Sequence, residues 1–124
     1  MGVMLFVASA LMVVLAVGHS IFGERFILGP LGRLPEPPRL AGQEFPLATV
    51  RFAWHVASGL SITIAAALFA VAVGAGPAAA IATAGWCLAA TAVLPFVYSR
   101  ARHPSWIVLA AAGAFCVLWS FSVG

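Results

Sequence analysis

Charge is scarce in this 124-residue sequence: 7% of the residues are charged, against about 25% in soluble domains. Lysine and aspartate are absent, which leaves three Glu and six Arg, while 64% of the residues are hydrophobic. A soluble domain of this length needs a more highly charged surface, and a disordered chain needs a much lower hydrophobicity. The composition excludes both classes and predicts a polytopic membrane protein.

Further absences exclude several functional classes. No cluster of arginines alternates with aromatic residues, so we exclude a nucleic-acid partner. No acidic residue lies inside a predicted span, whereas a small multidrug antiporter needs a membrane-embedded carboxylate. No span carries the polar stripe of a channel. Cys87 and Cys116 lack the C-x-x-C spacing of a redox pair, and we interpret both as small hydrophobes.

Four apolar segments are long enough to cross a membrane, because about 20 helical residues span its hydrocarbon core. They cover approximately residues 3–22, 47–73, 77–98 and 104–123. The short connection at 74–76 predicts an antiparallel hairpin, and the connection at 99–103 is similarly tight. We therefore predict a single all-α domain over 1–124, an integral membrane bundle of four antiparallel transmembrane helices.

The charged side chains all fall on one side of these four spans. They lie in the loop over 23–46, in the opening turn of the second span and in the connection at 99–103, whereas the termini and the 74–76 turn carry none. The positive-inside rule places the charged side in the cytoplasm, so both termini are expected outside it. We expect a multi-pass protein of the bacterial inner membrane.

The cytoplasmic loop over 23–46 is rich in proline but also apolar. Its prolines are expected to interrupt any helix, and its Phe and Leu side chains favour a position along the lipid headgroups. Alanine and glycine are frequent in the last three spans and predict close helix packing, while Trp54 and Trp86 are expected to lie between helices. Besides the bilayer, the expected partner is a second copy or another membrane subunit.

Four polar residues stand out at the cytoplasmic ends of the first two spans. His19 lies five residues before Glu24, and His55 lies four residues after Arg51. Because the two helices are expected to be antiparallel neighbours, these mirrored spacings place both histidines at a similar depth. We predict that His19, Glu24, Arg51 and His55 form one polar cluster.

The simplest interpretation of this cluster is a structural clamp between the two spans. Glu24 would pair with Arg51, and the two histidines would hydrogen-bond to Ser20, Ser58 or backbone carbonyls. Ionisable groups near helix ends are satisfied in this way without any further role. This interpretation predicts a non-catalytic membrane protein, such as an accessory subunit.

A cofactor site is the main alternative. Two histidines on separate helices at one depth are the ligand set of a b-type haem, so His19 and His55 are candidate axial ligands. Arg25 and Arg51 would then face the haem propionates. The sequence contains neither C-x-x-C-H nor H-E-x-x-H to support this site.

Two other interpretations use His103, which opens the fourth span on the same side. A single metal ion would be held by His19, His55, His103 and Glu24. An interfacial enzyme acting on a lipid or quinone would use histidine as acid or base and arginine to hold an anionic group, in a cleft lined by Arg51, His55 and His103.

Two short motifs carry a resemblance to a family. The motifs are GHSxxGE over residues 18–24 and RFAWH over residues 51–55. This pair resembles a pattern of small bacterial four-span inner-membrane proteins. The resemblance covers the first two spans and their loop, and it implies no activity. It directs attention to the same four residues as the spacing argument.

Overall fold

The computed structural model describes residues 2–123. Four of its helical stretches are long and apolar enough to cross a membrane. The prediction of an all-α protein with four span-length helices is confirmed. The elements in chain order are α1 (Gly2–Gly23), the π-helix η1 (Glu24–Leu28), α2 (Gly29–Gly32), β1 (Arg39–Leu40), β2 (Gln43–Glu44), α3 (Leu47–Ala72), α4 (Pro77–Thr91), α5 (Val93–Tyr98) and α6 (Ser105–Ser122).

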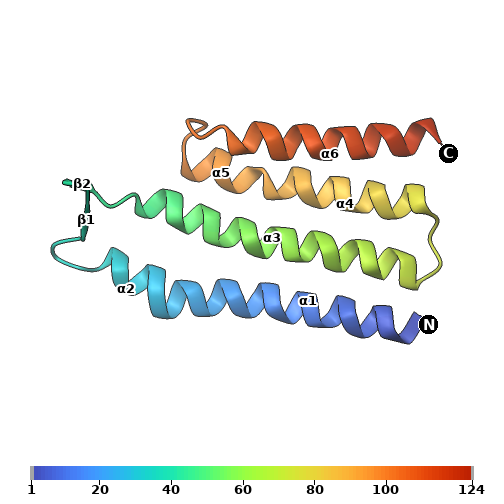
Figure 1. The fold of residues 1–124 in the computed structure, drawn as a ribbon, viewed down its shortest axis with the longest axis horizontal. Coiled ribbons are helices and arrows are strands. Elements are labelled where there is room, and N and C mark those ends of the chain that lie inside the picture. Colours follow the sequence, from blue (N-terminus) through green and yellow to red (C-terminus); the bar gives the residue numbers. More distant parts are fainter. Residues whose placement is uncertain (1, 124) are drawn as a thin grey trace.

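The long helices lie side by side in one row, in the order α1, α3, α4 with α5, and α6 (Figure 1). Extensive packing joins α1 to α3, α3 to α4, and α4 to α6. Within residues 2–123, α1 and α6 lie at opposite edges of this row and have no extensive contact. The two ends of the chain and the turn before α4 lie at one end of the molecule, and α2, the β-hairpin and the turn before α6 lie at the other (Figure 1). The helices therefore form an open layer.

The first helical stretch is longer than the sequence predicted. We expected it to end near residue 22 and the prolines of the loop over 23–46 to prevent a helix, but the helix continues through η1 and α2 to Gly32. Pro30 lies in the first turn of α2 but inside this continuous stretch, so its missing N–H leaves a carbonyl of the preceding turn without a helical partner. The turn before it widens into a π-helix, in which the Gly29 N–H donates to the carbonyl of Glu24. A β-carbon at Gly29 would lie 2.6 Å from that oxygen, so a larger residue does not fit there.

The rest of the loop contains a small β-hairpin. Arg39 pairs with Glu44, and Leu40 pairs with Gln43, in antiparallel register. The two connecting residues, at 41 and 42, have φ values of 51° and 80°. Positive φ at both central positions is what a two-residue hairpin turn of type I′ requires.

The third apolar stretch is interrupted once. α4 ends at Thr91 and α5 begins at Val93, whereas the sequence predicted one helix over 77–98. Pro95 has no N–H to donate to the Thr91 carbonyl, which explains the break four residues before it. Pro95 is fully buried, so the ring also fills space between helices.

Small residues bring α4 and α6 into backbone contact. A β-carbon at Gly85 would lie 2.8 Å from the carbonyl oxygen of Gly113, and one at Gly113 would lie 2.6 Å from that of Gly85. The prediction of close packing through small residues is confirmed for this pair. The prediction for Trp86 is wrong: its side chain is 64% exposed, whereas Trp54 packs between α1 and α3.

Large apolar side chains cover the outside of the layer. Exposed examples occur on every long helix, including Met4, Phe69, Trp86, Val108 and Phe115. A helix in a single layer contacts at most two neighbours, so two of its sides stay open. The buried core is correspondingly small and consists mostly of alanine.

Candidate functional site

Seven residues near the molecule's charged end converge between the first two long helices. We call this group the α1–α3 cluster; it consists of His19, Ser20, Glu24, Arg51, Trp54, His55 and Ser58. On α3, Arg51, His55 and Ser58 follow the i, i+4, i+7 spacing of one helix face. Glu24 opens η1, one helical turn beyond Ser20.

An ion pair lies at the end of this cluster. Nη2 of Arg51 lies 2.8 Å from Oε1 of Glu24, and Nε lies 3.2 Å from Oε2. Two such contacts between one guanidinium and one carboxylate make a geometrically specific pair. Nη2 also donates to the carbonyl of Leu28 at 3.3 Å. The Arg51 and Glu24 side chains are 27% and 43% exposed, so solvent reaches this end of the cluster.

His55 connects the ion pair to the serines. Its Nε2 lies 3.2 Å from Oε2 of Glu24, and its Nδ1 lies 2.9 Å from Oγ of Ser20. Both ring nitrogens therefore have partners. The imidazole is held between a carboxylate on one side and a hydroxyl on the other.

The hydrogen bonds continue from Ser20 to the second histidine. Oγ of Ser20 lies 2.8 Å from Oγ of Ser58, which in turn lies 3.1 Å from Nδ1 of His19. A continuous chain of side chains thus runs from Glu24 through His55, Ser20 and Ser58 to His19. It crosses between α1 and α3 at each step from His55 onwards.

Trp54 holds His19 in place. Its indole Nε1 donates to the backbone carbonyl of His19 at 2.8 Å. The two rings are also stacked, with centroids 4.7 Å apart and planes 7° from parallel. Gly23 leaves the space that the indole occupies, because a β-carbon there would overlap Nε1 of Trp54.

The structure brings together the four residues predicted to cluster, but two other predicted site residues lie elsewhere. Arg25 is exposed, with its guanidinium 5.6 Å from the ring centre of Phe26. His103 forms a hydrogen bond with Ser105 through Nδ1, and its ring packs edge-on against that of Phe52, with ring centroids 5.1 Å apart. A helix spacing places residues on one face, but it cannot show which helix that face meets.

The cofactor interpretations do not fit this arrangement. Within residues 2–123 no group of three or more His, Cys, Asp or Glu side chains is arranged to hold a metal ion. His103 is not hydrogen-bonded to the cluster, so the four-ligand metal site is not assembled among the residues that the structure describes. Both ring nitrogens of His55 are hydrogen-bonded within the cluster, so His55 offers no free nitrogen to a haem iron and a pair of axial histidine ligands is not available.

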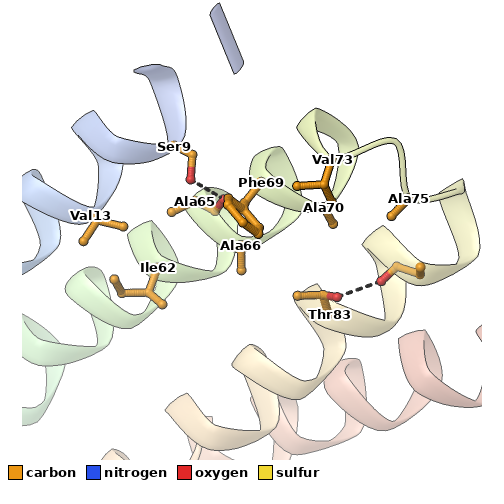
Figure 2. A pocket seen from close by; sticks show the side chains of 11 residues that line it. Ser9, Val13, Ile62, Ala65, Ala66, Phe69, Ala70, Val73, Ala75 and Thr83 are labelled. Carbon is orange, nitrogen blue, oxygen red and sulfur yellow. Dashed lines mark hydrogen bonds between the residues drawn. The ribbon is translucent and has the colours of Figure 1, made fainter. Parts of the chain in front are cut away.

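Two of the grooves on the described residues lie along α1 and α3. The larger, of about 510 Å³, lies between α1, α3 and α4 and is lined mainly by alanine and other apolar side chains (Figure 2). Its two hydroxyls are used within the protein: Ser9 donates to the carbonyl of Ala65, and Thr83 donates to that of Ala79, each at 2.8 Å. A smaller groove of about 300 Å³ runs along the cluster beside Ser20 and Ser58.

Comparison with known proteins produced no match to a family model, to a curated protein or to a solved structure. Function therefore has to be inferred from the α1–α3 cluster and from the packing of the helices. All buried side-chain nitrogen and oxygen atoms in residues 2–123 have a hydrogen-bond partner. No buried side-chain nitrogen or oxygen atom of the described part of the cluster is therefore left without a partner.

Proposed function

We propose that the chain is a multi-pass protein of the bacterial inner membrane, with four antiparallel transmembrane helices and both termini outside the cytoplasm. The apolar side chains exposed along every long helix support insertion, because such a surface is unfavourable in water. The charged residues all belong to the end that holds α2, the β-hairpin and the turn before α6. Positive charge at that end supports a cytoplasmic position for it.

We further propose that the protein acts as a non-catalytic subunit, in which two copies of the layer stack face to face. The observation that carries this proposal is the open layer: each long helix packs only on its neighbours along the chain, and both faces remain uncovered within residues 2–123. Helices in membranes associate where small residues permit close approach. The alanine-lined groove between α1, α3 and α4 is such a surface.

A second copy fits this surface better than a charged partner does. The groove is lined by no ionisable side chain, and all six arginines lie toward the opposite end of the layer. Two copies inserted in the same orientation would bring their apolar bodies together and leave both sets of charges at the cytoplasmic boundary. No charge would be buried between them.

Within this proposal the α1–α3 cluster is a clamp for an edge helix. Because α1 packs extensively on α3 alone, its position depends on that single interface. The ion pair, the serine bridge and the Trp54 hydrogen bond all cross it. We propose that the GHSxxGE and RFAWH motifs mark a family of small inner-membrane proteins that share this clamp.

The oligomeric state in lipid tests the subunit proposal. Native mass spectrometry of the protein in nanodiscs is expected to show a dimer. Ala79→Phe fills the groove and is expected to shift the population to monomer, whereas Val71→Phe, at an exposed position of α3 that does not line the groove, leaves the dimer intact. A wild-type protein that is monomeric at every lipid-to-protein ratio would exclude the proposal.

A further inference from the structure

The side chains that join Glu24 to His19 form a single file. Each of the four links is a hydrogen bond between side-chain atoms, with distances of 3.2, 2.9, 2.8 and 3.1 Å in order. Every interior member of this file can both give and accept a proton, because imidazole and hydroxyl groups carry donor and acceptor sites. We propose that Glu24, His55, Ser20, Ser58 and His19 form a proton relay.

The relay step moves one proton from His55 to His19 and leaves every heavy atom in place. Before the step, His55 carries protons on both nitrogens; Nδ1–H donates to Ser20, Ser20 donates to Ser58, and Ser58 donates to the bare Nδ1 of His19. During the step each donor passes its proton to the next group. Afterwards His55 is neutral and His19 carries the additional proton, while both serines are again neutral hydroxyls.

Both end states satisfy all the hydrogen bonds of the file. After the step Nε2–H of His55 still donates to Glu24, Ser20 donates to the bare Nδ1 of His55, and Nδ1–H of His19 donates to Ser58. Only the hydroxyl hydrogens and one imidazole proton change position. A static clamp needs only one of these two arrangements, whereas the file accommodates both without any movement of α1 or α3.

The two ends of the file differ in their access to water. The Glu24 side chain is 43% exposed, whereas Ser58 is 8% exposed and one face of the half-buried His19 ring is covered by Trp54. His19 lies five residues from Glu24, which corresponds to about 7.5 Å along the helix axis. The relay thus gives an imidazole inside the layer access to protons from the aqueous end.

The charged partner of the file lies at its Glu24 end. Arg51 forms an ion pair with Glu24 and is the one arginine of the cluster within residues 2–123. No ionisable side chain occurs on α1 before His19 or on α3 after His55. The relay therefore loads a proton site at His19 and provides no path across the whole layer. It does not depend on the oligomeric state proposed above.

Nitrogen-15 NMR of the histidine rings in nanodiscs tests the relay. The measured quantity is the rate at which the protonated and neutral forms of the His19 ring interconvert. Ser20→Ala removes the hydroxyl that connects His55 to Ser58. We expect the rate to fall about tenfold or more, because no hydrogen bond then joins these two groups. Ser20→Thr keeps a hydroxyl at the same position and is expected to restore the rate.

Ser61→Ala is the matched control. Ser61 is on α3 but donates to the carbonyl of Ala57 in its own helix, so its loss is expected to leave the rate of His19 unchanged. Ser58→Ala supplies an independent break in the file if Ser20→Ala perturbs the packing of α1, and it is expected to slow the exchange in the same way. Equal His19 rates in wild type and both single-serine variants of the file would overturn the proposal.

Discussion

Gly23 and Trp54 face each other across the α1–α3 interface so closely that a single added methyl group has no room. The indole fills the space beside Gly23, donates to the carbonyl of His19 and stacks on the His19 ring. Gly23 of the first motif and Trp54 of the second motif thus form one contact between the two helices. Their fit sets the register of α1 against α3.

Gly23→Ala is therefore expected to destabilise the protein by about 1–3 kcal/mol, the usual cost of overpacking a close contact. Thermal unfolding in mild detergent measures the loss, and a shift of the tryptophan emission reports displacement of Trp54. Gly76→Ala is the control, because a β-carbon at Gly76 meets nothing within 4 Å. Equal stabilities of the two variants would contradict the contact described here.

The Glu24–Arg51 pair is expected to contribute a measurable coupling energy. Interhelical polar pairs in membrane proteins contribute about 0.6 kcal/mol on average and up to about 1.7 kcal/mol, and a two-contact pair belongs to the upper part of that range. A double-mutant cycle with Glu24→Gln and Arg51→Gln measures it. Arg39 and Glu44, which pair in the exposed β-hairpin, form the control cycle and are expected to show a coupling near zero.

No haem is expected to bind. The protein purified from cells supplied with a haem precursor should lack a Soret band, because both ring nitrogens of His55 are hydrogen-bonded within the cluster. Ultraviolet–visible spectroscopy and metal analysis check this. A Soret band that disappears in both His19→Ala and His55→Ala would show that the cluster opens to admit the cofactor.

The close contact between α4 and α6 is expected to be disrupted by any residue larger than glycine at position 85 or 113. Gly113→Ala should lower stability by about 1–3 kcal/mol, since its new methyl group would meet the backbone of Gly85. Ala111→Val adds atoms at an exposed position of the same helix and is expected to have little effect. Unfolding in detergent compares them, and an unchanged midpoint for Gly113→Ala would argue against the close crossing.

Labelling of introduced cysteines tests the orientation, after Cys87 and Cys116 are replaced by alanine. Gly76→Cys lies in the turn predicted to be outside, so a membrane-impermeant maleimide is expected to label it in intact cells. Glu36→Cys lies in the loop predicted to be cytoplasmic, and labelling should require permeabilised cells. The reverse pattern would invert the proposed topology.

Much of the secondary structure could be predicted because it depends on local properties of the chain. Long apolar runs identified the four helices, and tight connections at 74–76 and 99–103 limited their ends. Pro30 and Pro95 were the exceptions. Whether a proline stops, follows or interrupts a helix depends on where the neighbouring turn begins, which hydropathy does not show.

The candidate site was partly predictable for a similar reason. Helical periodicity was sufficient to bring His19, Glu24, Arg51 and His55 together, because the spacings on two adjacent helices mirror each other. The haem and metal interpretations also included Arg25 and His103, which belong to other surfaces. The hydrogen-bonded file through two serines depends on interatomic distances, and no spacing rule supplies those.

The number of long apolar helices and the segregation of charge followed from the amino-acid sequence, since each reflects the hydropathy of a short segment. The open layer, the outward position of Trp86 and the register of α1 on α3 came from tertiary packing. An apolar side chain is equally compatible with lipid and with a neighbouring helix, so composition does not distinguish these two surroundings. Close contacts such as Gly23 with Trp54 and Gly85 with Gly113 make that distinction, because steric fit depends on both helices at once.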